Sequence, residues 1–115
     1  MKYLLLALAL ITGSAQASLQ SQPAPQVEIT DEDCDTFKQV SHDAVLFRND
    51  GTAVQVVKDT IVTNTLNETT EYKKLLPRMF SLVDKAYSDK TSTPDKESED
   101  TYMKCMDHVY AGTDF

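Results

Sequence analysis

The chain has little glycine and few basic residues. Only three of its 115 residues are glycine, and none lies in a phosphate-binding loop or a nucleophile elbow. It carries 11 Lys and Arg against 18 Asp and Glu, without a basic stripe interleaved with aromatic residues. The resulting net charge of −7 disfavours binding to phosphate backbones and to anionic lipid surfaces. We therefore expect no nucleic-acid partner.

Long hydrophobic runs are also missing. The only apolar run of note, 3–11, is too short for a permanent membrane helix, which needs about 20 residues. It follows a positively charged start and precedes an A-x-A cleavage motif that ends at Ala17. This pattern predicts a signal peptide over 1–17 and export to the periplasm or out of the cell, with no membrane span after cleavage. A buried N-terminal helix is the alternative, and no cysteine follows the run to carry a lipid anchor.

Cysteine is scarce, and its count is informative. The chain has two cysteines, and an even count in a small exported chain favours a disulfide. Only one internal pairing exists, so we expect a bond between Cys34 and Cys105. Closing a loop of this length constrains the unfolded chain by about 4 kcal/mol on the chain-entropy model. Two buried free thiols, or a bridge to another molecule, are the alternatives.

Hydrophobic periodicity predicts four amphipathic helices. The first covers 31–49, with Thr30 as its N-cap and Asp33 completing a capping box. The second begins at Thr52, the first residue of a T-x-x-Q capping box, and ends near 63–65. Local capping signals therefore mark the start of both helices.

The sequence marks the ends of the third helix weakly and the ends of the fourth helix clearly. The third follows Asn67 as N-cap and contains Pro77, which removes a donor and clashes with the preceding turn. Either the helix kinks at Pro77, or Pro77 starts a second helix after a short one. The apolar stripe stays in phase across it, which favours a kink or a tight break. The fourth helix begins with Thr93 as N-cap and Pro94 as its first residue, and Gly112 ends it.

Four such helices on short connections favour an all-α fold, a small antiparallel four-helix bundle with one disulfide joining the first and last helices. In up-down-up-down order the start of the first helix lies beside the end of the last. Cys34 and Cys105 occupy those two ends. The expected domain covers 30–115, after a flexible lead over 18–29 that contains two prolines.

No arrangement of residues points to catalysis or to a bound metal. In the expected bundle, His42 and His108 lie about 16 Å apart along the axis, too far for one metal ion. The neighbours Ser41 and Asp43 complete the residue types of a catalytic triad, but adjacent positions of a helix do not face each other. A carboxylate pair, such as Asp84 with an acid of the last helix, stays open without a spacing that singles it out. We expect no metal, no cofactor and no enzymatic activity.

The remaining candidates are surface residues. Tyrosine and arginine are common anchors of protein interfaces. Four tyrosines and the tip between the first two helices provide such residues in a small domain. The candidate interface residues are Arg48, Asp50, Tyr72, Tyr87, Tyr102 and Tyr110. The alternative is that most of the tyrosines are boundary residues whose hydroxyl groups contact water.

A pattern of short motifs runs through most of the predicted domain. It consists of a cysteine that opens a helix, R-x-x-G at its end, A-Y in a middle helix and a cysteine near the end of the chain. These are Cys34, Arg48 with Gly51, Ala86 with Tyr87, and Cys105. The pattern resembles a loose group of small exported bacterial and phage-borne proteins of unassigned function. The resemblance implies a helical, disulfide-bridged domain and no particular activity or site.

The design is more remotely similar to periplasmic immunity proteins against secreted amidases and to periplasmic acid-stress chaperones, although it carries no signature motif of either. We expect a periplasmic protein-interaction module, that is, an inhibitor, immunity or exclusion factor. Its expected partner is an envelope protein or a phage or effector protein. The alternatives are an acid-activated chaperone, in which protonation of carboxylates loosens the bundle, and a carrier of a small ligand between the helices.

Overall fold

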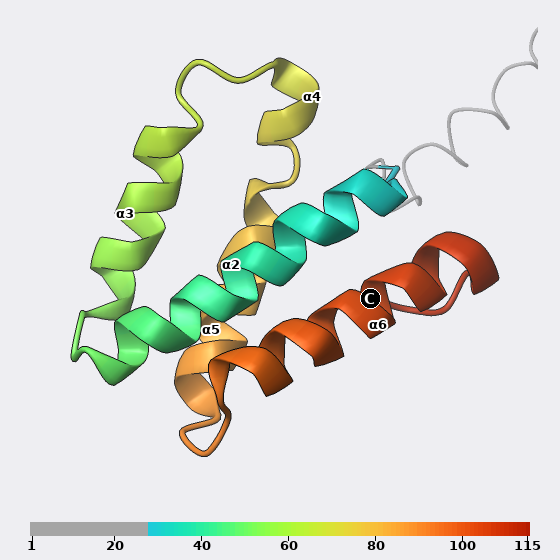
Figure 1. Ribbon diagram of the computed structural model, residues 1–115. Coiled ribbons are helices and arrows are strands. Elements are labelled where there is room, and N and C mark those ends of the chain that lie inside the picture. Colours follow the sequence, from blue (N-terminus) through green and yellow to red (C-terminus); the bar gives the residue numbers. More distant parts are fainter. Residues whose placement is uncertain (1–27) are drawn as a thin grey trace, which may run out of the picture.

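The computed structural model describes residues 28–115, and in this range the chain is helical and contains no strand (Figure 1). The elements are α2 (Asp31–Asn49), α3 (Val54–Asn64), α4 (Thr70–Lys73), α5 (Leu76–Ser88) and α6 (Pro94–Ala111). The all-helical prediction is confirmed. The predicted signal peptide and nearly all of the predicted lead lie outside the described residues. Within the described residues, no helix has the length and apolar character that a membrane span requires.

Helix α2 begins and ends where the sequence predicts. The Thr30 hydroxyl accepts a hydrogen bond from the Asp33 amide at 3.3 Å, and the Asp33 carboxylate accepts one from the Thr30 amide at 3.0 Å. This capping box satisfies two donors that no helical carbonyl can reach. Beyond the other end, Gly51 adopts a φ of 82°, a left-handed conformation that glycine takes without strain.

Helix α3 does not begin as predicted. Its N-cap is Ala53, which makes no side-chain capping bond, and Thr52 lies outside the helix. The Thr52 carbonyl instead accepts a hydrogen bond from the Tyr87 hydroxyl at 2.6 Å. Gln55, the expected partner in the capping box, donates to Asp59 at 3.0 Å. Thr52 therefore contacts α5 through its carbonyl and does not cap α3.

The segment around Pro77 follows the second of the two predicted paths. Thr69, and not Asn67, caps the short helix α4, with its hydroxyl accepting from the Tyr72 amide at 3.1 Å. A new helix, α5, then starts at Leu76 with Pro77 in its first turn, where a missing N–H leaves no helical bond unmade. The predicted start and end of α6 are confirmed.

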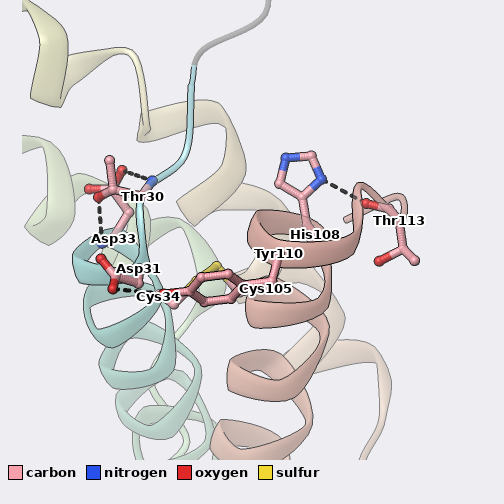
Figure 2. The surroundings of a disulfide bond; sticks show 8 residues. All are labelled: Thr30, Asp31, Asp33, Cys34, Cys105, His108, Tyr110 and Thr113. Carbon is pink, nitrogen blue, oxygen red and sulfur yellow. Dashed lines mark hydrogen bonds between the residues drawn. A yellow bond between two sulfur atoms is a disulfide. The ribbon is translucent and has the colours of Figure 1, made fainter.

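The predicted disulfide is present and fully buried (Figure 2). Cys34 near the start of α2 is bonded to Cys105 in the last turns of α6, with 5.5 Å between the Cα atoms. On the outside of this junction, the Tyr110 hydroxyl donates to the Asp31 carboxylate at 3.1 Å. The start of α2 and the end of α6 are thus joined by one covalent bond and one hydrogen bond.

Helices α2 and α6 lie side by side (Figure 1). Besides the disulfide, a buried pair of hydroxyls, Ser41 and Thr101, joins them at 2.7 Å. As residue numbers rise along α2 from Cys34 to Ser41, the numbers of their partners on α6 fall from Cys105 to Thr101. Both internal polar groups of this interface are satisfied, so burial carries no desolvation penalty for an unpaired hydroxyl.

Helix α5 connects two hydrophobic clusters. The first surrounds the disulfide and includes Phe37 and Leu82, while the second includes Val45, Val57 and Val83. Helix α5 packs directly on α2, α3 contacts α5 more than α2, and α5 makes little direct contact with α6. The α2–α5 pair therefore forms the centre, and the α2–α3 and α5–α6 edges stay open.

Candidate functional site

Two grooves follow the open edges. The first, which we call the α2–α3 groove, has a volume of about 390 Å³. The second, the α5–α6 groove, has a volume of about 500 Å³. Both lie in the range of ligand-binding clefts, which is about 300–1,000 Å³. The two grooves differ in the side chains that line them.

The C-terminal residue contributes to the wall of the α5–α6 groove. Phe115 lines this groove, and its ring centroid lies 5.6 Å from that of the buried Phe37. The guanidinium of Arg78 lies over the same ring, 4.7 Å from the centroid. Lys85 of α5 bridges the edge further along, pairing with Glu97 of α6 at 2.6 Å. Side chains of the chain itself therefore bridge this edge, and the groove remains beside them.

The α2–α3 groove is lined by residues of α2, α3, α4 and α5 and is mainly apolar. Val40 and Ala44 lie one turn apart on α2, Val57 and Ile61 lie one turn apart on α3, and the buried Met79 of α5 contributes to the lining. The complete lining consists of Thr36, Gln39, Val40, Asp43, Ala44, Phe47, Val57, Thr60, Ile61, Asn64, Thr65, Tyr72 and Met79. Such a surface suits an apolar group with one or two polar contacts at its edge.

Asp43 is the one charged side chain in this lining. Its Oδ1 atom accepts a hydrogen bond from the Gln39 amide at 2.8 Å and lies 3.4 Å from Nδ1 of His42. Within the described residues, its Oδ2 atom has no hydrogen-bond partner. About half of the side chain (47%) is exposed. The groove thus offers an open carboxylate oxygen beside an apolar floor.

Large apolar side chains are exposed on or next to the two helices that form the main walls of this groove. Within the described residues, five of the seven large hydrophobic side chains that are exposed lie on the last turns of α2, on α3 or directly after it. They are Leu46, Phe47, Val56, Val62 and Leu66. Exposed apolar patches that are rimmed by polar residues mark interaction sites. The groove and the exposed residues beside it form the strongest candidate site of the described chain.

Arg48, a predicted interface residue, uses its donors inside the molecule. Its guanidinium donates to the carbonyls of Ala86 and Ser92, both at 2.8 Å, and to the carbonyl of Asp89. These carbonyls belong to the end of α5 and the loop that leads to α6. Arg48 therefore ties the last turn of α2 to the α5–α6 connection. Asp50 is exposed and forms the C-cap of α2.

The four predicted tyrosines do not gather at one place. Tyr72 is half-buried and lines the α2–α3 groove. Burial raises the pKa of Tyr87, whose hydroxyl is bonded to the backbone. On α6, the ring of Tyr102 lies under the ammonium of Lys38, and Tyr110 is 70% exposed. A hydrogen bond to Asp31 raises the pKa of Tyr110. Only Tyr72 belongs to the groove.

Sequence reasoning missed most of the residues that line the groove, among them Asp43, Phe47 and Thr60. One signal was available. Helix α3 carries valine at 54, 56, 57 and 62, which is more than one face of a helix. A surface helix needs only one apolar face to pack, so the additional valines point to a second contact surface.

The histidines lie apart. Nε2 of His42 is 3.7 Å from the carboxylate of Asp95 at the start of α6, whereas Nδ1 of His108 is 2.7 Å from the carbonyl of Thr113 (Figure 2). Within residues 28–115, no three His, Cys, Asp or Glu side chains form a group that could hold a metal ion.

A buried carboxylate lies at the opposite end of α6 from the disulfide. Glu97 is 2% exposed and accepts hydrogen bonds from the Ser92 hydroxyl at 2.7 Å and from the Lys85 ammonium at 2.6 Å. Lys85 also pairs with Asp100 at 3.4 Å. Burial lowers the pKa of Lys85, but the hydrogen bond and charge of Glu97, aided by Asp100, outweigh it and raise the pKa above 10.5.

The Lys85 ion pair predicts a stability difference that disappears at alkaline pH. Because its folded pKa is raised, the stabilisation by Lys85 is complete below pH 10.5 and is lost as the pH rises through that folded pKa. We expect Lys85→Met to lower the free energy of unfolding by about 1 kcal/mol at pH 7, allowing for solvent screening. Urea denaturation at neutral and strongly alkaline pH measures this difference.

The matched control is Lys104→Met. Lys104 also pairs with Asp100, at 3.2 Å, but does not contact Glu97. Its replacement is expected to change stability by a few tenths of a kcal/mol. A Lys85→Met effect that is as large at alkaline pH as at pH 7, or no larger than that of the control, would contradict the prediction.

Comparisons of the chain with protein-family models, with curated proteins and with solved structures found no match.

Proposed function

We propose that the protein is an exported protein-interaction module that binds an envelope protein through the α2–α3 groove, as an inhibitor, immunity or exclusion factor. One observation carries the proposal: most of the exposed large apolar side chains of the described chain lie on or next to the two helices that form the main walls of an open apolar groove. Phe47 at the end of α2 lines the groove and is 38% exposed, and Val56 on α3 is 53% exposed outside the lining. A stable interface needs about 800 Å² on each partner, which a single groove of this size does not provide.

The frame of this surface is held rigidly, which favours recognition. The disulfide and the Ser41–Thr101 pair fix α2 against α6. Lys58 of α3 pairs with Asp84 of α5 at 2.8 Å and fixes the other wall. Preorganised surfaces lose less conformational entropy on binding.

The proposal has three further parts. The opposite residue order along α2 and α6 supports an antiparallel four-helix bundle. The disulfide supports a location in an oxidising compartment, for which we propose the periplasm or the exterior of the cell. The four short motifs around Cys34, Arg48, Ala86 and Cys105 support kinship with the loose group of exported bacterial and phage-borne proteins.

One alternative has a specific observation in its favour. The groove volume of about 390 Å³ is large enough for a small ligand, which favours a carrier function. A carrier encloses most of its ligand, whereas Val56 and Leu66, outside the groove lining, leave apolar side chains exposed to solvent. A protein partner would cover these side chains, and we therefore prefer the protein-interaction function to the carrier function.

Photo-crosslinking from the groove tests the proposal. A benzoylphenylalanine residue replaces Thr60, an exposed groove residue, in the full-length protein produced in its native host. We expect one dominant crosslinked species, because the partner covers this position and benzophenone reacts only with groups in contact. Mass spectrometry identifies the partner, and mixing the two purified proteins is expected to reproduce the crosslink.

The same residue placed at Glu99, an exposed position of α6 outside both grooves, is the control. It is expected to give no dominant product. Equal crosslinking from both positions, or no crosslink from Thr60 at native expression, would count against the proposed surface.

A further inference from the structure

The α2–α3 groove, we infer, binds an aromatic side chain of the partner that lies next to a lysine or arginine, and Asp43 pairs with that cation. The inference deepens the proposed function and depends on it. It names the chemistry of the contact, which the proposed function leaves open. Three observations on the described chain support it.

The first is the packing of side chains at the other open edge. In the α5–α6 groove an aromatic ring, Phe115, packs on the buried Phe37 and carries the guanidinium of Arg78 above it. At one open edge of this fold, an aromatic side chain thus packs together with a cation. The α2–α3 groove is the corresponding edge on the other side of the central α2–α5 pair and is of similar size.

The second observation is the composition of the groove. Val40, Val57 and Ile61 are partly or fully buried aliphatic residues, and they present no donor or acceptor from their side chains. Met79 adds a thioether, which makes favourable contacts with aromatic rings. A flat aromatic ring buries a large apolar area against such a surface and loses little rotamer entropy.

The third observation is the charge at the edge. Asp43 Oδ2 has no hydrogen-bond partner within residues 28–115, and His42 is the one basic residue in this range that pairs with this carboxylate. Two cations on the helices that form the groove walls have partners of their own, because Lys58 of α3 pairs with Asp84 and Arg48 of α2 binds backbone carbonyls. A cation from a partner therefore meets an acceptor that the chain does not neutralise with Lys or Arg.

Small amines with a phenyl ring test this inference directly. The probe is 3-phenylpropylammonium, and its anionic and neutral counterparts are 3-phenylpropionate and 3-phenylpropanol. Titration of the isotope-labelled protein, followed by amide NMR shifts, is expected to perturb Val40, Ala44, Val57 and Ile61. We expect the cation to bind about fivefold more tightly than the anion, because the two charge interactions with Asp43 have opposite sign.

The sequence offers a matched pair of variants. Gln39 donates to Asp43 and Gln55 donates to Asp59, each from one helical turn before the carboxylate, at 2.8 and 3.0 Å. Asp43 lines the groove and Asp59 does not. Asp43→Asn is expected to make the affinities for the cation and the anion about equal. Asp59→Asn is expected to leave the cation bound about fivefold more tightly. The amide spectra also show whether each variant is folded.

Several outcomes would overturn the inference. The absence of shifts in the groove at millimolar probe, or shifts confined to the α5–α6 groove, would exclude the aromatic contact. Equal affinity for all three probes would show that charge plays no part, and an unchanged preference in Asp43→Asn would exclude Asp43. The crosslink from Thr60 does not depend on this charge. A crosslink with no cation preference would therefore disprove the inference and retain the proposed function.

Discussion

Replacing both cysteines with alanine is expected to lower the free energy of unfolding by about 4 kcal/mol. Cys34 and Cys105 are 71 residues apart, and their bond restricts the unfolded chain to a large closed loop. Both residues are fully buried, so alanine avoids placing an unpaired hydroxyl in the core. Urea denaturation followed by circular dichroism measures the change, which is a large share of the stability of a domain of this size.

Reduction of the wild-type protein is the matched control. It opens the same loop without removing side-chain atoms and is expected to account for most of the loss. If the oxidised protein and the double variant unfolded at the same urea concentration with equal slopes, the prediction would fail. A reduced protein that stays as stable as the oxidised one would likewise contradict it.

Arg48→Met is expected to lower the free energy of unfolding by about 3 kcal/mol. The guanidinium satisfies three backbone carbonyls, those of Ala86, Asp89 and Ser92, and a hydrogen bond from a charged group contributes about 1.5–3 kcal/mol. Losing the arginine leaves these groups partly buried at the end of α5 without a donor. Methionine preserves much of the apolar stem, so the measured change reports on the lost donors.

Arg48→Lys serves as the companion variant. It keeps the charge but lacks the planar fork that reaches several carbonyls at once. We expect its stability to lie between those of the wild type and Arg48→Met. Amide hydrogen exchange near Asp89 and Ser92 is expected to rise in both variants. A loss below about 0.5 kcal/mol for Arg48→Met, typical of a surface substitution, would show that the three bonds contribute little.

The accuracy of the sequence predictions depends on how local the determining contact is. The bounds of α2 were correct because Thr30 and Asp33 form their capping box within one turn, whatever the rest of the chain does. The predicted start of α3 was wrong: Ala53 is the N-cap, and Thr52 instead bonds through its carbonyl to Tyr87, 35 residues further along the chain. Periodicity and capping motifs carry no information about such a partner.

The same reasoning explains the outcome for the candidate site. Arg48 was predicted as an interface residue because it lies at the tip between the first two helices, and this role stays a prediction. Sequence reasoning did not show that its guanidinium bonds to backbone carbonyls 38 to 44 residues away. The cysteine pairing was confirmed because only one internal choice existed. For Tyr87, whose hydroxyl is bonded to the Thr52 carbonyl, the interface role stays a prediction, as it does for Asp50.

The groove itself was beyond sequence reasoning. The groove exists because α5 packs directly on α2, while α2 and α3, and likewise α5 and α6, make few contacts with each other. The stripe of Met79, Leu82, Val83 and Ala86 predicts that α5 is buried but not which neighbour it contacts first. Only the valines on more than one face of α3 hinted at an open surface.

The disulfide has one more consequence, which concerns damage rather than folding. All of α3, α4 and α5 lies between Cys34 and Cys105. A protease that cuts the exposed connection at Lys90 and Thr91 produces two pieces, and the sulfur–sulfur bond keeps them as one covalent molecule. After a single nick, the Ser41–Thr101 contact can re-form without the fragments having to find each other by diffusion.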